Sequence, residues 1–400
     1  MKLKFLYTFL FLFSLNLYSK ETNVSVDSYN AAFSFTPGNI IVGRLKSTLG
    51  YVDNFLYSEL EPVATSFLEV EPSLFLQMQM ERNLIQLLAS TTQFKFSEFS
   101  EDDHGNYDFT AKYHFKPSLN QRFSATAHFE LLYEERGTGL SQGEGSSIVK
   151  GDEKEISFYN LGYYYGHENS VARTWLLVGQ RSFEYTTRRE ITKVLDHTGD
   201  YLEVGADYLY SGKSYFTGKI NYENLSYKFN LNSSRIEKAA LFGFKWYSSI
   251  ISKSEFLFGL SELDFYESNI GNKNTFRWEV DLIWQPTEFY EFEFTSARSI
   301  EDASQITSDY KVVDNYTLYF KHNFTANVDF VFDIGRKNQQ VIFSNEENNE
   351  NYNLLSVRTV YQANKSLLVF FNYEFKQLQS TYSSDDFNRN NVSIGLDFKI

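Results

Sequence analysis

The chain has 400 residues and a formal charge of −14, an acidic balance that argues against binding nucleic acid through an extended basic face. Aromatic residues make up 18% of it, with 29 Tyr and 39 Phe, whereas only 5 Pro occur and Cys is absent. The lack of Cys excludes disulfides, so hydrogen bonding and packing must hold the fold together.

Residues 1–19 have the pattern of a secretory signal peptide. Lys2 and Lys4 form a short positive region, residues 5–17 are largely apolar, and Ser19 is a small residue at the cleavage position. The apolar run is shorter than the roughly 20 residues that a membrane-spanning helix requires. We therefore expect export, cleavage before Lys20, and a short N-terminal extension over residues 20–38.

From residue 39 to residue 400, apolar and polar positions alternate with the period of β-strands. In residues 276–284 every second side chain is Phe, Trp, Val or Leu, while Arg277, Glu279 and Asp281 occupy the other face. A helix, whose period is near 3.6, could not keep these two sets apart. One apolar and one charged face, with abundant aromatic residues, favour a transmembrane barrel over a soluble sandwich.

Breaks between the expected strands are alternately short and long, as periplasmic turns and extracellular loops would be. The short breaks are 80–83, 117–120, 166–169, 211–214, 285–288, 322–326 and 363–365. The long ones are 54–62, 100–105, 135–154, 184–199, 267–273, 299–309, 337–350 and 380–390. Breaks 230–234 and 249–252 cannot be ranked by length. We predict an all-β, antiparallel, up-and-down barrel of about 18 strands, with 16 as the lower count and both termini periplasmic.

The cost of burying charge in lipid indicates which face is inside. An Arg or Lys that faces lipid at the midplane of a barrel costs roughly 2–4 kcal/mol, so the charged face must line the lumen. The predicted lumen-lining residues are Lys219, Glu223, Arg277, Glu279, Asp281, Glu291, Glu293, Asp329, Asp333, Glu374 and Lys376.

The last strand, residues 391–400, alternates without interruption. Ser393, Gly395, Phe398 and Ile400 resemble the terminal signal that the barrel-assembly machinery reads, although the commoner last residue is Phe. An ordinary amphipathic strand would explain the alternation but not the glycine or the terminal position. We therefore expect insertion into the outer membrane of a Gram-negative cell, among its lipids and lipopolysaccharide.

No constellation predicts catalysis, a metal centre or a cofactor. The six His form no metal-binding pair, and neither a nucleophile elbow nor a phosphate-binding loop occurs. Asp196-His197 is interpreted as a solvated loop pair, and Glu291 with Glu293 as pore lining. The break at 135–154 and the run 345–350 are expected to be solvated loops. Carboxylates at 101–103 or at 346, 347 and 350 could bridge a hard cation to lipopolysaccharide.

Several segments together resemble the β-barrel porins encoded in exopolysaccharide biosynthesis operons. They are Leu49-Gly50-Tyr51-Val52-Asp53-Asn54, Gly205-Ala206-Asp207-Tyr208, Trp284-Gln285-Pro286-Thr287, Thr295-Ser296-Ala297-Arg298-Ser299-Ile300-Glu301 and the stretch 385–400. The segments mark turns and strand ends. The departures are Val52, where that family has Asp, and a higher content of Phe and Tyr.

The resemblance implies passive export of a polysaccharide through the barrel, together with a periplasmic polysaccharide-export protein. Tyr201, Tyr319 and Trp175 are candidates for stacking against sugar rings, and filling of the barrel wall or of an interface girdle is the favoured alternative for each. The alternatives are a general or solute-specific diffusion porin, an outer-membrane enzyme and an adhesive barrel.

Overall fold

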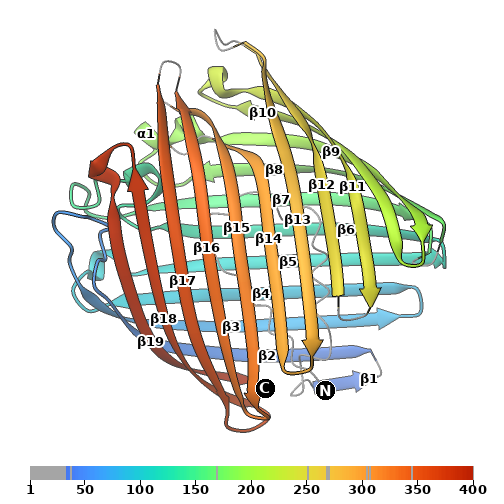
Figure 1. The fold of residues 1–400 in the computed structure, drawn as a ribbon. Helices are drawn as coiled ribbons and strands as arrows, with labels where there is room; N and C mark the ends of the chain where they lie inside the picture. Colours follow the sequence, from blue (N-terminus) through green and yellow to red (C-terminus); the bar gives the residue numbers. More distant parts are fainter. Residues whose placement is uncertain are drawn as a thin grey trace.

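A computed structural model of the chain describes residues 33–36, 38–167, 170–249, 252–266, 271–302, 305, 308–343 and 346–399. The predicted signal peptide (1–19), residues 20–32 and 37 of the predicted extension, and Ile400 lie outside the described residues. Antiparallel strands enclose a central lumen (Figure 1). The prediction of an all-β barrel is confirmed: 18 strands, β2 to β19, form the closed wall.

Each strand of the wall pairs with its neighbours in the sequence, and the first pairs with the last. The strands are β2 (Asn39–Val52), β3 (Thr65–Met80), β4 (Asn83–Phe96), β5 (His104–Ser118), β6 (Gln121–Glu134), β7 (Asp152–Tyr165), β8 (Ala172–Tyr185), β9 (His197–Ser211), β10 (Ser214–Tyr227), β11 (Arg235–Ser249), β12 (Ser252–Phe265), β13 (Lys273–Thr287), β14 (Tyr290–Asp302), β15 (Ser308–Thr325), β16 (Val328–Phe343), β17 (Glu347–Gln362), β18 (Leu367–Ser380) and β19 (Phe387–Lys399). Because about 9–11 residues suffice to cross a bilayer as a tilted strand, the wall extends beyond the membrane.

Pairing between β19 and β2 closes the ring. The register runs from Asn391 opposite Val52 to Lys399 opposite Arg44. A short additional strand, β1 (Phe33–Thr36), pairs with Asn39–Ile41 at the start of β2. One edge of β2 pairs with β3, so β1 must pair with the opposite edge. This is the edge that pairs with β19 further along the strand. At the far end of β2, the Asp53 carboxylate accepts hydrogen bonds from the Asn390 backbone and side chain, both at 2.7 Å.

Successive connections lie alternately at the two ends of the barrel (Figure 1). Those at one end, the long-loop end, are mostly longer than the turns at the other end, although only residues 344–346 separate β16 from β17 there. The two breaks that could not be ranked are now assigned: 249–252 is a short turn, and 227–235 is a long connection. The strands β2 and β19 begin and end at the short-turn end. Within the described ranges, the helical turns all lie in connections at the long-loop end. They are η2 (Ser100–Asp102), η3 (Gly139–Ser141), α1 (Arg189–Thr192), η4 (Lys193–Leu195), η5 (Leu231–Ser233) and η6 (Ser383–Asp385). No helix among the described residues has the length and apolar character to span a membrane.

Two predicted loops are too long. Residues 337–350 are mostly strand, because β16 continues to Phe343 and β17 begins at Glu347, with Gln339 opposite Glu350. Residues 299–309 likewise contain the end of β14 and the start of β15. These parts of the wall lie beyond the membrane-spanning length, where no outer apolar face is needed, so the alternation that marks a strand disappears.

The wall divides at the long-loop end between β13 and β14. Their described pairing stops at Trp278 opposite Arg298, although β13 begins at Lys273 and β14 continues to Asp302. Beyond that point, the ends of β14 and β15 pack with β12 in a buried cluster that contains Leu263, Ile300 and Tyr310. The end of this hairpin is therefore displaced from the wall position next to β13.

We expect substitution of Gly395 to destabilise the closure of the barrel. A Cβ at this position would lie 2.3 Å from Phe370 Cζ and 2.6 Å from the Ser47 backbone oxygen, so Gly395→Ala forces a shift worth roughly 1–3 kcal/mol. The measurement is the fraction of barrel that resists unfolding in SDS without heating, after refolding from urea into detergent.

Gly218→Ala is the matched control, because its Cβ would meet Phe242 at an ordinary 3.4 Å. Refolding without the assembly machinery separates packing from the predicted role of Gly395 in the assembly signal. Equal folded fractions for the two variants would contradict the prediction.

Candidate functional site

The lumen wall is the candidate site, and its charged side chains are linked to one another across strands. On β13, Phe276 and Trp284 are about half exposed on the outer face, whereas Glu279 has the opposite orientation. Glu279 accepts a hydrogen bond at 2.8 Å from Lys219 Nζ on β10. Since β10 and β13 are not neighbours, this contact must cross the concave, inner side of the sheet.

Several predicted lumen residues form ion pairs there. Lys219 pairs with Glu279, Arg277 with Glu237 at 2.6 Å, Glu223 with Arg181 at 2.5 Å, Asp329 with Lys321 at 3.0 Å, and Glu374 with Lys376 at 2.7 Å. The structure thus brings together Lys219 with Glu279, Arg277 with Glu279 (3.7 Å) and Glu374 with Lys376. Arg277, Glu223 and Asp329 pair with residues that were not predicted but also face inward, namely Glu237, Arg181 and Lys321.

The remaining predicted residues gather on β13, β14 and β16. Glu293 lies opposite Tyr319 in the register of β14 and β15, and Tyr319 lies opposite Asp333 in the register of β15 and β16. Glu291 is opposite Lys321, and Asp281 occupies the inward face of β13. This part of the wall, near the short-turn end, is predominantly acidic.

The three candidates for sugar stacking occupy inward positions. Trp175 Nε1 donates to Glu203 at 2.8 Å, and Lys245 Nζ lies 5.1 Å from the centre of the Trp175 ring. Tyr201 stacks on Phe158, with ring centres 5.7 Å apart and planes inclined by 3°. One face of each of these two rings is therefore occupied by another side chain of the protein.

The longest connection, residues 135–151, folds back across the mouth of the barrel. Its Arg136 donates to Asp102, from Nη2 at 2.5 Å and from Nε at 3.1 Å, and both residues are buried. The Tyr133 hydroxyl donates to the same carboxylate at 2.6 Å. Breaking such a buried pair by removing one partner costs roughly 3–5 kcal/mol, because the other charge remains desolvated.

The same loop reaches the far wall. Arg389 Nη1 on β19 donates to the Glu135 carboxylate at 2.9 Å, and the Tyr57 hydroxyl also donates to Glu135. Gln142 Nε2 donates to Glu350 on β17 at 2.8 Å. These contacts span from the β6–β7 connection to β17 and β19, so the loop bridges distant parts of the ring.

Apolar packing anchors the side of the loop nearer to its own strands. Leu140 packs on a buried cluster of Tyr185, Leu195, Leu225 and Tyr227, which belong to β8, the β8–β9 connection and β10. The loop, residues 135–151, is therefore held on both sides of the lumen, and we call it the strap.

The expectation that residues 135–154 form a solvated loop is wrong for its two ends: Arg136, Gly137 and Ser141 are buried and β7 begins at Asp152, whereas most of residues 143–150 are exposed. Its glycines, which suggested flexibility, allow close packing instead. Gly137 has a φ of +80°, and a Cβ there would lie 2.1 Å from the Leu56 backbone oxygen. A Cβ at Gly145 would lie 2.4 Å from the same oxygen. Small residues were needed because the strap contacts the backbone of the β2–β3 connection.

A second inward element closes the mouth from the β14–β15 side. Asp302, the last residue of β14, accepts hydrogen bonds from Arg181 Nη1 and from Arg181 Nη2, the latter at 3.1 Å. Arg235 Nη2 also donates to Asp302 at 3.1 Å, and His197 Nε2 lies 3.1 Å from it. One carboxylate thus joins β8, β9, β11 and β14.

The interpretation of Asp196-His197 as a solvated pair is therefore wrong as well. Asp196 is fully buried and accepts hydrogen bonds from Arg189 and from the Tyr185 backbone at 3.1 Å. His197 is 2% exposed and belongs to the Asp302 cluster. Sequence reasoning missed these contacts because the partners are far apart in the chain; only the inward positions of Arg181 and Arg235 could have indicated them.

The acidic groups considered for a hard cation are separated in the structure. Asp102 pairs with Arg136, whereas Asp103 pairs with Lys95 at 2.9 Å. Glu350 is buried among amides, and Glu346 accepts from Tyr382 at 2.8 Å. Over the described part of the chain, no group of three His, Cys, Asp or Glu side chains could hold a metal ion.

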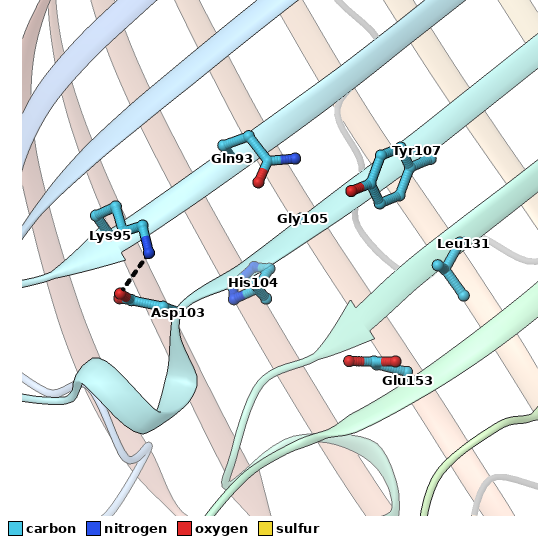
Figure 2. A pocket seen from close by; sticks show the side chains of 8 residues that line it. All are labelled: Gln93, Lys95, Asp103, His104, Gly105, Tyr107, Leu131 and Glu153. Atoms are coloured by element: carbon cyan, nitrogen blue, oxygen red, sulfur yellow. Dashed lines mark hydrogen bonds and ion pairs between the residues drawn. The ribbon is translucent and has the colours of Figure 1, made fainter.

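A separate pocket of about 360 Å³ lies on the wall of β4–β7 near the long-loop end. Figure 2 shows Lys95 and Asp103 joined at one side of it, with Gln93, Tyr107, Leu131 and Glu153 toward the other side. Partial burial opposes ionisation of Asp103, but hydrogen bonds from Lys95 and from the Phe96 N–H hold its pKa below the usual value. This carboxylate is thus charged at neutral pH.

A closed ring of antiparallel strands, apolar outside and charged inside, defines an outer-membrane, porin-like β-barrel. Residues 232–400, which contain β11–β19, are similar to the family described as "Putative beta-barrel porin 2". The match covers less than half of the chain. The match confirms the resemblance to a β-barrel porin family. It gives no information on the operon that encodes the chain. No curated protein matches the sequence.

Solved outer-membrane barrels superpose on the chain, and of the three that follow the first reaches a TM-score of 0.50. The FrpB iron transporter from Neisseria meningitidis (F5-1 variant) superposes with a TM-score of 0.50 at 8% identity, over 94% of this chain and 84% of that chain. OpdK from Pseudomonas aeruginosa gives 0.48 at 9% identity, over 90% and 99%. A BenF-like porin from Pseudomonas fluorescens Pf-5 gives 0.49 at 10% identity, over 90% and 99%. At such identities the likeness concerns the fold alone.

We predict that Asp102→Asn releases the strap. The substitution leaves the buried Arg136 without its counter-charge, a cost of roughly 3–5 kcal/mol that is relieved if the strap moves into water. Limited trypsin digestion in detergent should then cleave after Arg136 and Lys150 faster than in the unmodified protein.

Asp264→Asn is the control. Its carboxylate lies on the outer face, 3.9 Å from Lys238, with both side chains over 40% exposed. Such a pair contributes about 0–1 kcal/mol. Cleavage of the strap at the same rate in both variants would show that the Arg136–Asp102 pair does not hold it.

Proposed function

We propose that the protein is a channel for passive diffusion of small hydrophilic solutes across the outer membrane, and that the strap forms its constriction. The observation that carries the proposal is the strap itself, which crosses the mouth and is fixed by the buried Arg136–Asp102 pair and by the partly exposed Glu135–Arg389 pair. A barrel of this strand number encloses an aqueous passage unless something fills it.

The arrangement of the ends supports an orientation. Short turns and the ends of β2 and β19 would lie in the periplasm, and the strap would close the passage from the cell surface. The inner wall then presents paired charges through the membrane, from Lys219 and Glu279 to the acidic positions around Tyr319. Solutes that pass would exchange hydration for contacts with these groups.

Export of a polysaccharide is the second candidate. The resemblance to porins of exopolysaccharide operons favours it, and so does Trp175, which faces inward beside the Glu203 carboxylate. Aromatic rings next to carboxylates can hold sugar rings weakly by stacking and hydrogen bonding. An extended glycan would require the strap to leave the mouth, and a periplasmic export protein would be the expected partner.

Single-channel conductance in planar bilayers tests the diffusion channel. We expect the unmodified barrel to conduct, and the double variant Arg136→Gln/Arg389→Gln to conduct at least about twofold more, because a wider aqueous passage carries more current. A variant in which the Gly-rich middle of the strap, residues 138–148, is deleted should conduct similarly to the double variant.

Arg298→Gln is the matched control, since Arg298 forms a two-point pair with Asp314 on the outer face of β14 and β15. It should leave the conductance unchanged. A silent unmodified barrel, or equal currents in the double variant and the control, would contradict a channel constricted by the strap.

Deletion of the gene tests the second candidate. If the barrel exports a polysaccharide, the deletion removes that polymer from the cell surface and leaves it in the periplasm, as fractionation and sugar analysis would detect. Normal surface polysaccharide in the deletion strain would exclude this role while leaving the diffusion channel intact.

A further inference from the structure

The pocket of β4–β7 opens on the outside of the barrel. Tyr107 on β5 is 48% exposed and has the same orientation as Phe109, which is 45% exposed two residues further along the strand. Gln93 and Lys95 on β4 alternate in the same sense against Phe94 and Phe96, whose rings pack inward beside His104. In Figure 2 the pocket side chains lie in front of the wall, and the opposite strands are seen behind it.

The depth of the pocket corresponds to the polar region of a lipid leaflet. Its residues lie within the first or last few positions of β4, β5, β6 and β7 at the long-loop end. Further toward the short turns, the same outer face carries Phe109, Phe129 and Tyr159, each at least 40% exposed. Apolar and aromatic side chains on that face meet the hydrocarbon and its interface. The pocket above them therefore meets lipid head groups.

The chemistry of the pocket is that of a site for neutral hydroxyl groups. The Lys95 ammonium is paired with Asp103 at 2.9 Å, and Glu153 is paired with Lys150 at 3.5 Å. Such paired charges offer both donors and acceptors without a net charge, whereas a bare phosphate would need unbalanced cations. Gln93 and Tyr107 add an amide and a phenol.

Gly105 contributes space to the pocket floor. A Cβ at this position would lie 2.3 Å from Gln93 Nε2. The glycine thus leaves the Gln93 amide in place and the floor of the pocket open. With a volume of about 360 Å³, the pocket is at the lower end of the range of small-ligand sites.

We propose that this pocket, formed by Gln93, Lys95, Tyr107 and Glu153, binds the sugar head group of a membrane glycolipid. Sugar hydroxyls both donate and accept hydrogen bonds, which suits amide, ammonium and carboxylate groups side by side. The Tyr107 ring supplies an apolar surface at the rim. The site is separate from the lumen, so it does not depend on the proposed channel function.

Native mass spectrometry of the full-length barrel in detergent tests the proposal with three probes: diphosphorylated lipid A, its dephosphorylated form, and phosphatidylglycerol. We expect both sugar lipids to bind with similar affinity and phosphatidylglycerol to bind more weakly. Gln93→Ala and Glu153→Gln should each weaken binding of the sugar lipids by about fivefold, the ratio that loss of one hydrogen bond gives.

Lys238→Ala is the control, because Lys238 lies on the outer face near the long-loop end of β11, with a side chain 49% exposed. Resistance to SDS without heating verifies that each variant is folded. Unchanged affinity in Gln93→Ala and Glu153→Gln would overturn the proposal. It would also be overturned if lipid A and phosphatidylglycerol bound while dephosphorylated lipid A did not, since the pocket would then recognise an anionic group.

Discussion

The structure depends on the rule that no backbone N–H or C=O can remain unpaired in hydrocarbon. An antiparallel sheet satisfies this rule only when its first and last strands meet, and here β2 and β19 pair over the whole length of Arg44–Val52. Closure makes the two faces of every strand unequal, with lipid outside and water inside. The aromatic outer face and the charged lumen both follow from this difference between the two sides of the wall.

On the inner side, charges occur mainly in pairs, and the pairs near the mouth join segments that are distant in the sequence. Arg136 meets Asp102, Arg389 meets Glu135, and Arg181 meets Asp302. A pair of this kind gives little net stability, but it is costly to break from one side, so it fixes position more than it adds energy. That is the property needed where a loop must remain at one place in an aqueous passage.

The part of the fold that lies in the membrane was predictable, because lipid enforces a strict period of two on residues such as Arg277 and Glu279. The ends were not. Lys337 and Gln339 face inward on a strand end that lies beyond the lipid, where they contact Glu301 and Glu350, so no outer apolar face marked residues 336–340 as strand. The strap was misjudged for a related reason: glycine permits both mobility and close packing, and only the position of the Leu56 backbone distinguishes them for Gly137. The inward direction of charges could be deduced from local sequence, whereas their partners could not.

The separation of β13 from β14 affects how the wall responds to force. Pairing stops at Trp278, roughly the 9–11 residues above the short turn that a bilayer requires. Between Trp278 and the short turns every strand of the wall pairs with both of its neighbours. The circumference of this part cannot increase without breaking a full ladder of hydrogen bonds. Above it β13 and β14 are not paired, and the end of the β14–β15 hairpin is held by its packing against Leu263 and by the hydrogen bonds from Arg181 and Arg235 to Asp302. Backbone pairing thus closes the wall at the level of the membrane, whereas side-chain contacts hold the rim, so loss of those contacts would open the rim and leave the closed ladder in the membrane intact.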